Sequence, residues 1–277
     1  MLSRIARKMN GLVRPRTMHT RNIMSVAEQH DMYRDTDECF FAGLYLSSIR
    51  TALRSFPDKK RRILDAGCGQ GRLAIPLAKE GYRVDAVDMT PAAVERGRCY
   101  AAGEGVTVNF TVEEIRGFLR KTADRVYDAV LCIEMLYMIP EHQSVLADLV
   151  RILKEGGILA VSVRPRLYYV LYHMMRKDLI QVETALVSSS SRDHGFFSWW
   201  ESTSLREKLT SLGLCDVQLA GLGVATGIDG DPQACFARPS DFEADEQRAK
   251  LLQLESALGT RYPDCGRYIL AVGRKGK

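Results

Sequence analysis

The chain has 277 residues, of which 46% are hydrophobic and 26% are charged; this composition is ordinary for a globular protein and excludes a fibrous or largely disordered one. No apolar stretch reaches the roughly 18 residues of a membrane-spanning helix, so no membrane span is predicted. The net charge is +5, but six of the 39 basic residues lie in the acid-free segment 1–27, which leaves 33 against 34 acidic residues. A nearly neutral body argues against a nucleic-acid partner, which needs a basic face.

The basic segment 1–27 has two interpretations. Its Arg-rich, acid-free composition is that of a mitochondrial transit peptide, whereas many chains simply begin with a flexible tail; we favour the tail. The seven cysteines include no C-x-x-C pair and the five histidines are dispersed, so neither a disulfide framework nor a metal site is expected. These features predict a cytoplasmic protein, with the mitochondrial matrix as the alternative.

Beyond the tail, helices and strands alternate. Apolar spacing predicts helices at 36–56, 71–80, 91–102, 115–121 and 143–153, and strands at 62–66, 83–87, 106–112, 128–133 and 158–163, the last entered by a turn at Gly156-Gly157. Strands that are almost continuously apolar and separated by helices indicate a parallel sheet covered on both faces.

The pattern is less regular beyond residue 163. Residues 164–200 hold an amphipathic helical segment at 167–180 and the aromatic loop DHGFFSWW. Helices at 202–212 and 241–258 and strands at 216–222 and 267–272 complete the chain. We therefore predict a Rossmann-like, doubly wound α/β fold with a mostly parallel, seven-stranded sheet.

The segment RRILDAGCGQGRLAIPLAKEGYRVDAVDMTP, residues 61–91, has a glycine-rich turn between a strand and a helix, where backbone can approach a ligand closely. From Gly69, GQGRLA matches a dinucleotide fingerprint, but Asp65–Cys68 then separate it from its strand. Read from Asp65, the pattern is D-x-G-x-G-x-G, and the strand-end carboxylate can accept hydrogen bonds from an ammonium group such as that of S-adenosylmethionine. Asp88, at the end of the next strand, can bind the ribose hydroxyls of either ligand.

Four segments in order, ILDAGCGQGRL, AVDMT, YDAVLCIEMLYMI and LKEGGILAVSV, resemble the successive motifs of class I S-adenosylmethionine-dependent methyltransferases. The resemblance covers about residues 61–163. It implies that Gly67, Gly69 and Gly71 lie against the methionine half of the cofactor, that Asp88 binds the ribose, and that Met89 packs on the adenine.

The same resemblance implies roles for residues after the third and fourth strands. Glu114 aligns with an acid that contacts the adenine amino group and Ile115 with the alanine after it; Glu113 replaces a glycine of the motif and is the alternative acid. Ile133 lines the far side of the cofactor. Met138 stands where family members often have histidine.

The resemblance also implies a domain organisation and an activity. Residues 28–277 would form one methyltransferase domain, with a helical cap at 28–57, a cofactor-binding core at 61–163 and a substrate lid at 164–200. The expected reaction moves a methyl group from S-adenosylmethionine to an oxygen or nitrogen of a small, partly apolar molecule.

No catalytic residue is predicted, because methyl transfer from a sulfonium depends mainly on alignment. Tyr137 and His194 are the candidate substrate-side residues. The alternative function is that of an RNA or protein methyltransferase. It is disfavoured by the nearly neutral charge of the chain beyond residue 27 and by the sequence I-E-M-L after the fourth strand, where an N-P-P-Y motif would stand. The third possibility is an NAD(P)-dependent oxidoreductase. The oligomeric state is not predicted.

Overall fold

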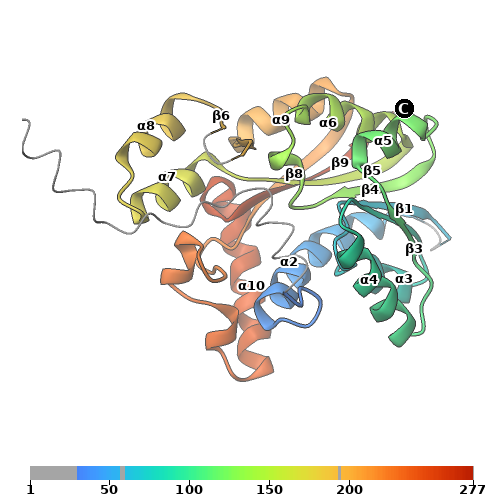
Figure 1. Cartoon of the computed structure of the whole chain (residues 1–277), viewed down its shortest axis with the longest axis horizontal. Helices are drawn as coiled ribbons and strands as arrows, with labels where there is room; N and C mark the ends of the chain where they lie inside the picture. The colour runs from blue at the N-terminus through green and yellow to red at the C-terminus, as the bar shows by residue number, and fades with distance from the viewer. Residues whose placement is uncertain (1–29, 57–59, 193–194, 277) are drawn as a thin grey trace, which may run out of the picture.

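The computed structural model describes residues 30–56, 60–192 and 195–276. In this part of the chain, seven strands form one sheet in the order β3-β2-β1-β4-β5-β9-β8 (Figure 1). The strands are β1 Arg62–Ala66, β2 Arg83–Asp88, β3 Asn109–Val112, β4 Tyr127–Cys132, β5 Leu153–Val163, β8 Leu214–Leu222 and β9 Tyr268–Lys275. The first five are parallel, and β9 runs antiparallel to both β5 and β8. The predicted fold class is confirmed.

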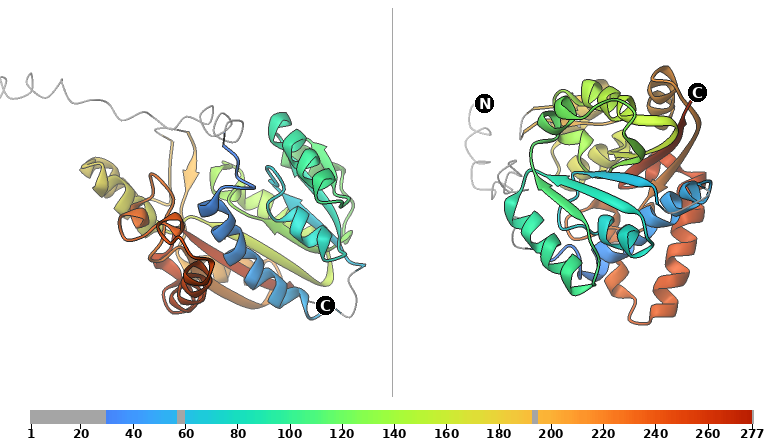
Figure 2. Two further views of the ribbon diagram at one scale, coloured as in Figure 1. Left: turned by 90° about the horizontal axis from the view of Figure 1, so that it is seen from below. Right: turned by 90° about the vertical axis from the view of Figure 1, so that its right-hand side faces the viewer.

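Helices cover both faces of this sheet (Figure 2). One face carries α2 Thr36–Leu53, α3 Ala74–Lys79, α4 Pro91–Gly103 and α10 Asp245–Arg261; the other carries α5 Ile115–Lys121, α6 His142–Arg151 and α9 Ser202–Ser211. Short 3-10 helices lie at η1 Leu136–Met138, η2 Pro232–Cys235, η3 Pro239–Asp241 and η4 Pro263–Cys265. After β5 the chain forms α7 Arg166–Met175, α8 Leu179–Val187 and the small pair β6 Ser190–Ser191 and β7 Phe197–Ser198.

The two helical layers bury alternate side chains of the same strands. In β4, Ala129 and Leu131 belong to the core under α2, while Val130 and Cys132 belong to the core under α6. This alternation follows from the two-residue repeat of a strand. It explains why the central strands read as continuous apolar runs in the sequence.

Two predicted details of the elements are wrong. Gly156 and Gly157 do not form a turn before the fifth strand; they lie inside β5, where its register with β4 shifts and Gly156 has a φ of 72°. The expected helix at 167–180 is two helices, because Lys177 has a φ of 59°, outside the right-handed helical region. Among the described residues, no helix is long and apolar enough to cross a membrane.

The sheet order places a switch point between β1 and β4. The connections through α3 and α4 run to one side of β1, and the later strands β4 and β5 lie on the other side. In open parallel sheets, ligands bind at such a point, beyond the carboxyl ends of the strands. Asp65, Asp88 and Ile133 all lie at or just after those ends.

Candidate functional site

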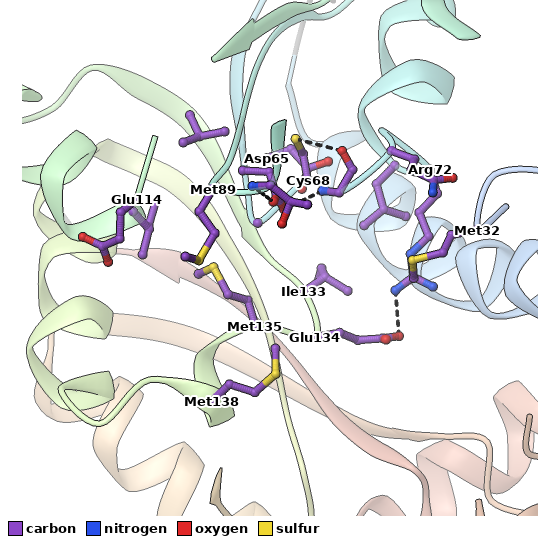
Figure 3. A pocket seen from close by; sticks show the side chains of 18 of the residues that line it. Met32, Asp65, Cys68, Arg72, Met89, Glu114, Ile133, Glu134, Met135 and Met138 are labelled. Atoms are coloured by element: carbon purple, nitrogen blue, oxygen red, sulfur yellow. Dashed lines mark hydrogen bonds and ion pairs between the residues drawn. The ribbon is translucent and has the colours of Figure 1, made fainter. Parts of the chain in front are cut away.

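A cavity of about 380 Å³ opens at the carboxyl ends of β1, β2, β3 and β4 (Figure 3). Its lining includes Asp65, Gly67, Gly69, Asp88, Met89, Glu113, Glu114, Ile115, Ile133 and Tyr137. Of the predicted site residues, therefore, only Gly71 and His194 are absent from this wall. His194 lies outside the described residues.

The three glycines of the turn have different local roles. All have a positive φ: 79° at Gly67, 51° at Gly69 and 83° at Gly71. A Cβ at Gly67 would lie 2.7 Å from the sulfur of Met135, and one at Gly71 would lie 2.9 Å from the ring of Phe110. A Cβ at Gly69 would meet no atom within 4 Å. Gly71 thus serves packing under the turn, whereas Gly69 leaves open space on the cavity wall.

The Asp88 carboxylate is fixed by two backbone amides. The amide of Gly69 donates to Oδ2 at 2.9 Å and the amide of Thr90 donates to Oδ1 at 2.8 Å. Each oxygen keeps a further acceptor site, since a carboxylate oxygen has two lone pairs. Asp88 therefore holds the glycine turn in place and can still accept hydrogen bonds from a pair of hydroxyls in the cavity.

Asp65 is the most unusual carboxylate of the cavity. It is only 2% exposed, and its Oδ2 has no hydrogen-bond partner. Burial raises its pKa to about 7, with the neighbouring Asp88 adding to the rise and the guanidinium of Arg72 opposing it. A buried acceptor without a partner costs free energy that a ligand can recover. A donor or cation in the cavity would supply that partner.

Arg72 joins two carboxylates beside the cavity. Its guanidinium lies 2.5 Å from Oε2 of Glu38, on α2, and 2.8 Å from Oε1 of Glu134, directly after β4. Although burial opposes ionisation, Arg72 and the more distant Arg267 and Arg164 lower the pKa of Glu134 to about 2. Glu134 has a φ of 57° and its amide donates to Ser162 Oγ at 2.7 Å. This strained position holds an ionised carboxylate at the cavity wall.

The charge of the cavity is predominantly negative. Among the described residues that line it, Arg72 is the sole Lys or Arg, against five acids: Asp65, Asp88, Glu113, Glu114 and Glu134. Glu113 pairs with Lys121, Glu114 with Arg116 and Glu134 with Arg72. Asp65 and Asp88 have no ion pair within the described part of the chain. The arrangement therefore suits a ligand that carries a positive charge.

The end of the cavity beside α5 is partly apolar. Met89, 55% exposed, and Ile115 line it, and Glu114 caps α5 by accepting a hydrogen bond from Gly117 N at 3.2 Å. The Glu114 carboxylate lies at the opposite side of the cavity from Arg72 and Glu134 (Figure 3). Glu113 and Glu114 both line the cavity, so the choice between them stays open.

Tyr137 connects the cavity to a buried aromatic cluster. Its hydroxyl lies 3.3 Å from that of Tyr268, and its ring stacks on Phe197 with centroids 6.3 Å apart. Met32, Met135 and Met138 line the cavity nearby. Thioether side chains fill irregular apolar space and adapt to different ligands. His142 is not in the lining; it begins α6 and stacks against Phe196.

Sequence reasoning missed the Arg72–Glu134 pair. The sequence did contain an indication of Glu134, because an acid follows β4 just as Asp65 and Asp88 end β1 and β2.

Within the described residues, no group of three or more His, Cys, Asp or Glu side chains could hold a metal ion.

Comparison with known families identifies the domain around the cavity. A family model described as a methyltransferase domain matches residues 63–157. The part of this chain around the cavity is thus similar to methyltransferase domains, and its fold is that of S-adenosylmethionine-dependent methyltransferases. The matched range holds β1 to β4 and the glycine turn, so the methyltransferase domain contains most of the cavity wall.

Relatives of known name match a longer part of the chain than the family model does. The chain is 30% identical over 168 residues to a ubiquinone biosynthesis O-methyltransferase of Rickettsia canadensis, covering 59% of this chain and 66% of that protein. It is 31% identical over 153 residues to the protein of the same name from Pectobacterium carotovorum, covering 53% and 64%. The chain thus spans a little under two thirds of the length of these relatives.

Solved structures show the same fold. A S-adenosylmethionine-dependent methyltransferase from Methanosarcina mazei superposes with a TM-score of 0.54 and 17% identity, over 81% of this chain and 96% of that one. A magnesium protoporphyrin IX methyltransferase from Synechocystis, crystallised with S-adenosylhomocysteine, superposes with a TM-score of 0.53 and 17% identity, over 70% and 87%. At this identity the similarity concerns the methyltransferase fold alone.

Proposed function

We propose that this chain binds S-adenosylmethionine and transfers its methyl group to an oxygen or nitrogen of a small, partly apolar molecule. The observation that carries the proposal is the buried, unpartnered Oδ2 of Asp65 in an acid-rich cavity at the switch point of the sheet. A dinucleotide has a pyrophosphate, which such a cavity would repel, whereas S-adenosylmethionine carries a sulfonium and an ammonium. The names of the relatives favour oxygen as the accepting atom.

Each cofactor group has a matching part of the wall. Asp65 would accept a hydrogen bond from the ammonium group, and the open space at Gly69 would admit the methionine half. Asp88 would accept hydrogen bonds from the ribose hydroxyls, with Met89, Ile115 and one of the two acids at the adenine end. Ile133 would line the far side.

When bound, the cofactor supplies an electrophilic methyl group on a good leaving group. The residues of this chain would then align the acceptor and exclude water, and such alignment can supply roughly 7–11 kcal/mol of a barrier. Tyr137, Met135 and Met138 would form the acceptor side. With a pKa of about 2, Glu134 is a poor general base, so a role in orienting the acceptor or cofactor suits it better.

Further parts of the proposal concern organisation and partners. Residues 28–277 would act as one domain, with α2 in the N-terminal cap and residues 164–200 over the acceptor, where His194 is a further candidate. We expect no nucleic-acid partner, because the chain beyond residue 27 has 33 basic and 34 acidic residues. A cytoplasmic location is proposed, with the mitochondrial matrix as the alternative.

Two measurements test the proposal. Isothermal titration calorimetry should detect binding of S-adenosylhomocysteine and no binding of NAD or NADP; tight dinucleotide binding alone would refute it. The protein should then be incubated with methyl-labelled cofactor and cell extracts separated into small molecules, protein and RNA. Label confined to RNA or protein would replace the small-molecule acceptor with the alternative function.

A further inference from the structure

Two short helices after β5 expose an apolar surface. The exposed large hydrophobic side chains on α7 and α8 are Leu167, Leu171, Met174, Met175, Leu179, Ile180, Leu186 and Val187. Ile180 is 74% exposed and Val187 is 87% exposed. The helices lie side by side at one end of the molecule (yellow in Figure 1). We call these eight side chains the α7–α8 surface.

The pattern along each helix is that of an amphipathic surface. On α7 the exposed residues follow the spacing i, i+4, i+7 and i+8, which places them on one side of a helix, while Tyr168 and Tyr169 are buried on another. On α8, Ile180 and Val187 are seven residues apart and share a face, opposite the buried Val182. Large apolar side chains arranged this way mark a contact surface.

Basic side chains lie at one end of this surface. Arg176 and Lys177 form the turn between α7 and α8, and both are exposed. The ammonium group of Lys177 has no hydrogen bond or ion pair with another described residue, and Arg176 packs its guanidinium 3.5 Å from the ring centroid of Tyr172. Apolar side chains beside exposed cations are typical of helices that bind the interface of an anionic membrane.

The size of the surface argues against a second copy of the chain as its occupant. With 10 and 9 residues, the helices are about 15 and 14 Å long and about 10 Å wide each, so together they present about 300 Å². A stable dimer needs about 800 Å² on each partner. A bilayer sets no such minimum, because each inserted side chain contributes independently.

A chain of aromatic contacts joins this surface to the cavity. Tyr169, on the inner side of α7, contacts Phe197 with ring centroids 6.2 Å apart, and Phe197 stacks on Tyr137, which lines the cavity. We propose that the α7–α8 surface docks on a bilayer that contains anionic phospholipid. This inference rests on the proposed function. An apolar acceptor molecule dissolved in the membrane would then reach the enzyme beside its cavity.

The test uses the full chain and vesicles of phosphatidylglycerol and phosphatidylcholine, with co-sedimentation as the readout at about 150 mM NaCl. The double variant Ile180→Gln, Val187→Gln should bind these vesicles at least tenfold more weakly, since two large side chains no longer insert. Lys177→Asn, suited to the positive φ of this position, should weaken binding about fivefold. Calorimetry with S-adenosylhomocysteine should give the same affinity for the parent and the variants, which separates this inference from the cofactor site.

The matched control is Phe236→Gln, Leu254→Gln, which also removes two exposed apolar side chains, one directly after η2 and one on α10. It should bind vesicles like the parent chain. Equal binding by the α7–α8 double variant would overturn the proposal and assign binding to another part of the chain, such as the basic segment 1–27. Absence of vesicle binding by the parent chain, or a dimer in sedimentation velocity that the double variant abolishes, would overturn it too.

Discussion

Arg72 and Glu134 lie 2.8 Å apart, Nη2 to Oε1, although 62 positions separate them in the sequence. Glu38 completes the group from α2, so one guanidinium holds together the N-terminal helix, the start of α3 and the end of β4. These three charges are almost fully buried. Removing one of them leaves the others uncompensated, at a cost that exceeds the net contribution of the intact pair.

The first prediction concerns this group. Arg72→Met should lower the free energy of unfolding by about 3 kcal/mol or more, because Glu38 and Glu134 keep buried charges without a partner. Urea denaturation followed by circular dichroism measures the change. Arg50→Met is the matched control: Arg50 pairs with Glu80 at 2.6 Å but is 44% exposed, so a loss below about 1 kcal/mol is expected. Equal losses in both variants would contradict the prediction.

The second prediction concerns Asp88. Asp88→Ala should weaken binding of S-adenosylhomocysteine by at least about 100-fold, because about 3 kcal/mol of hydrogen bonding to a charged acceptor is lost. Calorimetry gives the affinity. Asp85→Ala removes an acid from the same strand that accepts hydrogen bonds from Arg62 and Tyr127 and is not in the cavity lining. That variant should keep its affinity; normal binding by Asp88→Ala, with an unchanged fold, would show that the ribose lies elsewhere.

The third prediction compares two glycines. Gly69 and Gly105 have φ values of 51° and 67°, and at neither would a Cβ meet an atom within 4 Å. Alanine should therefore cost a similar 1–2 kcal/mol of stability at both positions. Only Gly69 lines the cavity, so only Gly69→Ala should abolish binding of S-adenosylhomocysteine. If Gly105→Ala lost affinity as well, backbone strain would explain the effect without contact with the ligand.

The fourth prediction concerns pH. The raised pKa of Asp65, about 7 against 3.8 in an unfolded chain, means that the folded protein binds one more proton between those values. The contribution of Asp65 to the unfolding free energy is therefore most favourable below about pH 4 and falls as the pH rises to 7. The ammonium group of S-adenosylhomocysteine favours the ionised form of Asp65, so this ligand should bind about tenfold more tightly at pH 8 than at pH 6.

Asp65→Asn provides the control for this pH dependence. Asparagine cannot ionise, so both the fall in stability and the rise in affinity across this range should disappear. Chemical denaturation between pH 4 and pH 7 gives the stability, and calorimetry at pH 6, 7 and 8 gives the affinity. A pH dependence that persists in Asp65→Asn would belong to another group.

The sequence predicted the parts of the site that depend on local pattern. Asp65 and Asp88 could be placed because they end apolar strands, and the carboxyl ends of parallel strands meet at one edge of the sheet. Gly67 and Gly69 could be placed because a strand-to-helix turn requires positive φ.

The remaining features depend on tertiary contacts. No local pattern indicates that Arg72 points towards both Glu38 and Glu134, since α2 must first pack on the sheet. Gly156-Gly157 has the composition of a turn, yet β5 continues through it because β4 pairs with Leu153 before the two glycines and with Ile158 after them. The break between α7 and α8 at Lys177 could not be predicted, because the apolar spacing of a helix continues across it in the sequence.

The antiparallel direction of β9 has a practical consequence for immobilising the protein. Because β9 runs opposite to β5, its last residues lie beside the beginning of β5, where Lys275 Nζ donates to the carbonyl of Leu153 at 2.8 Å. The cavity lies at the other edge of the sheet, and Gln70 Nε2 ties the carbonyl of His30 to the glycine turn there at 2.7 Å. A sensor surface or fluorophore attached after Lys275 would therefore leave the cavity mouth free, whereas one attached near His30 would crowd it.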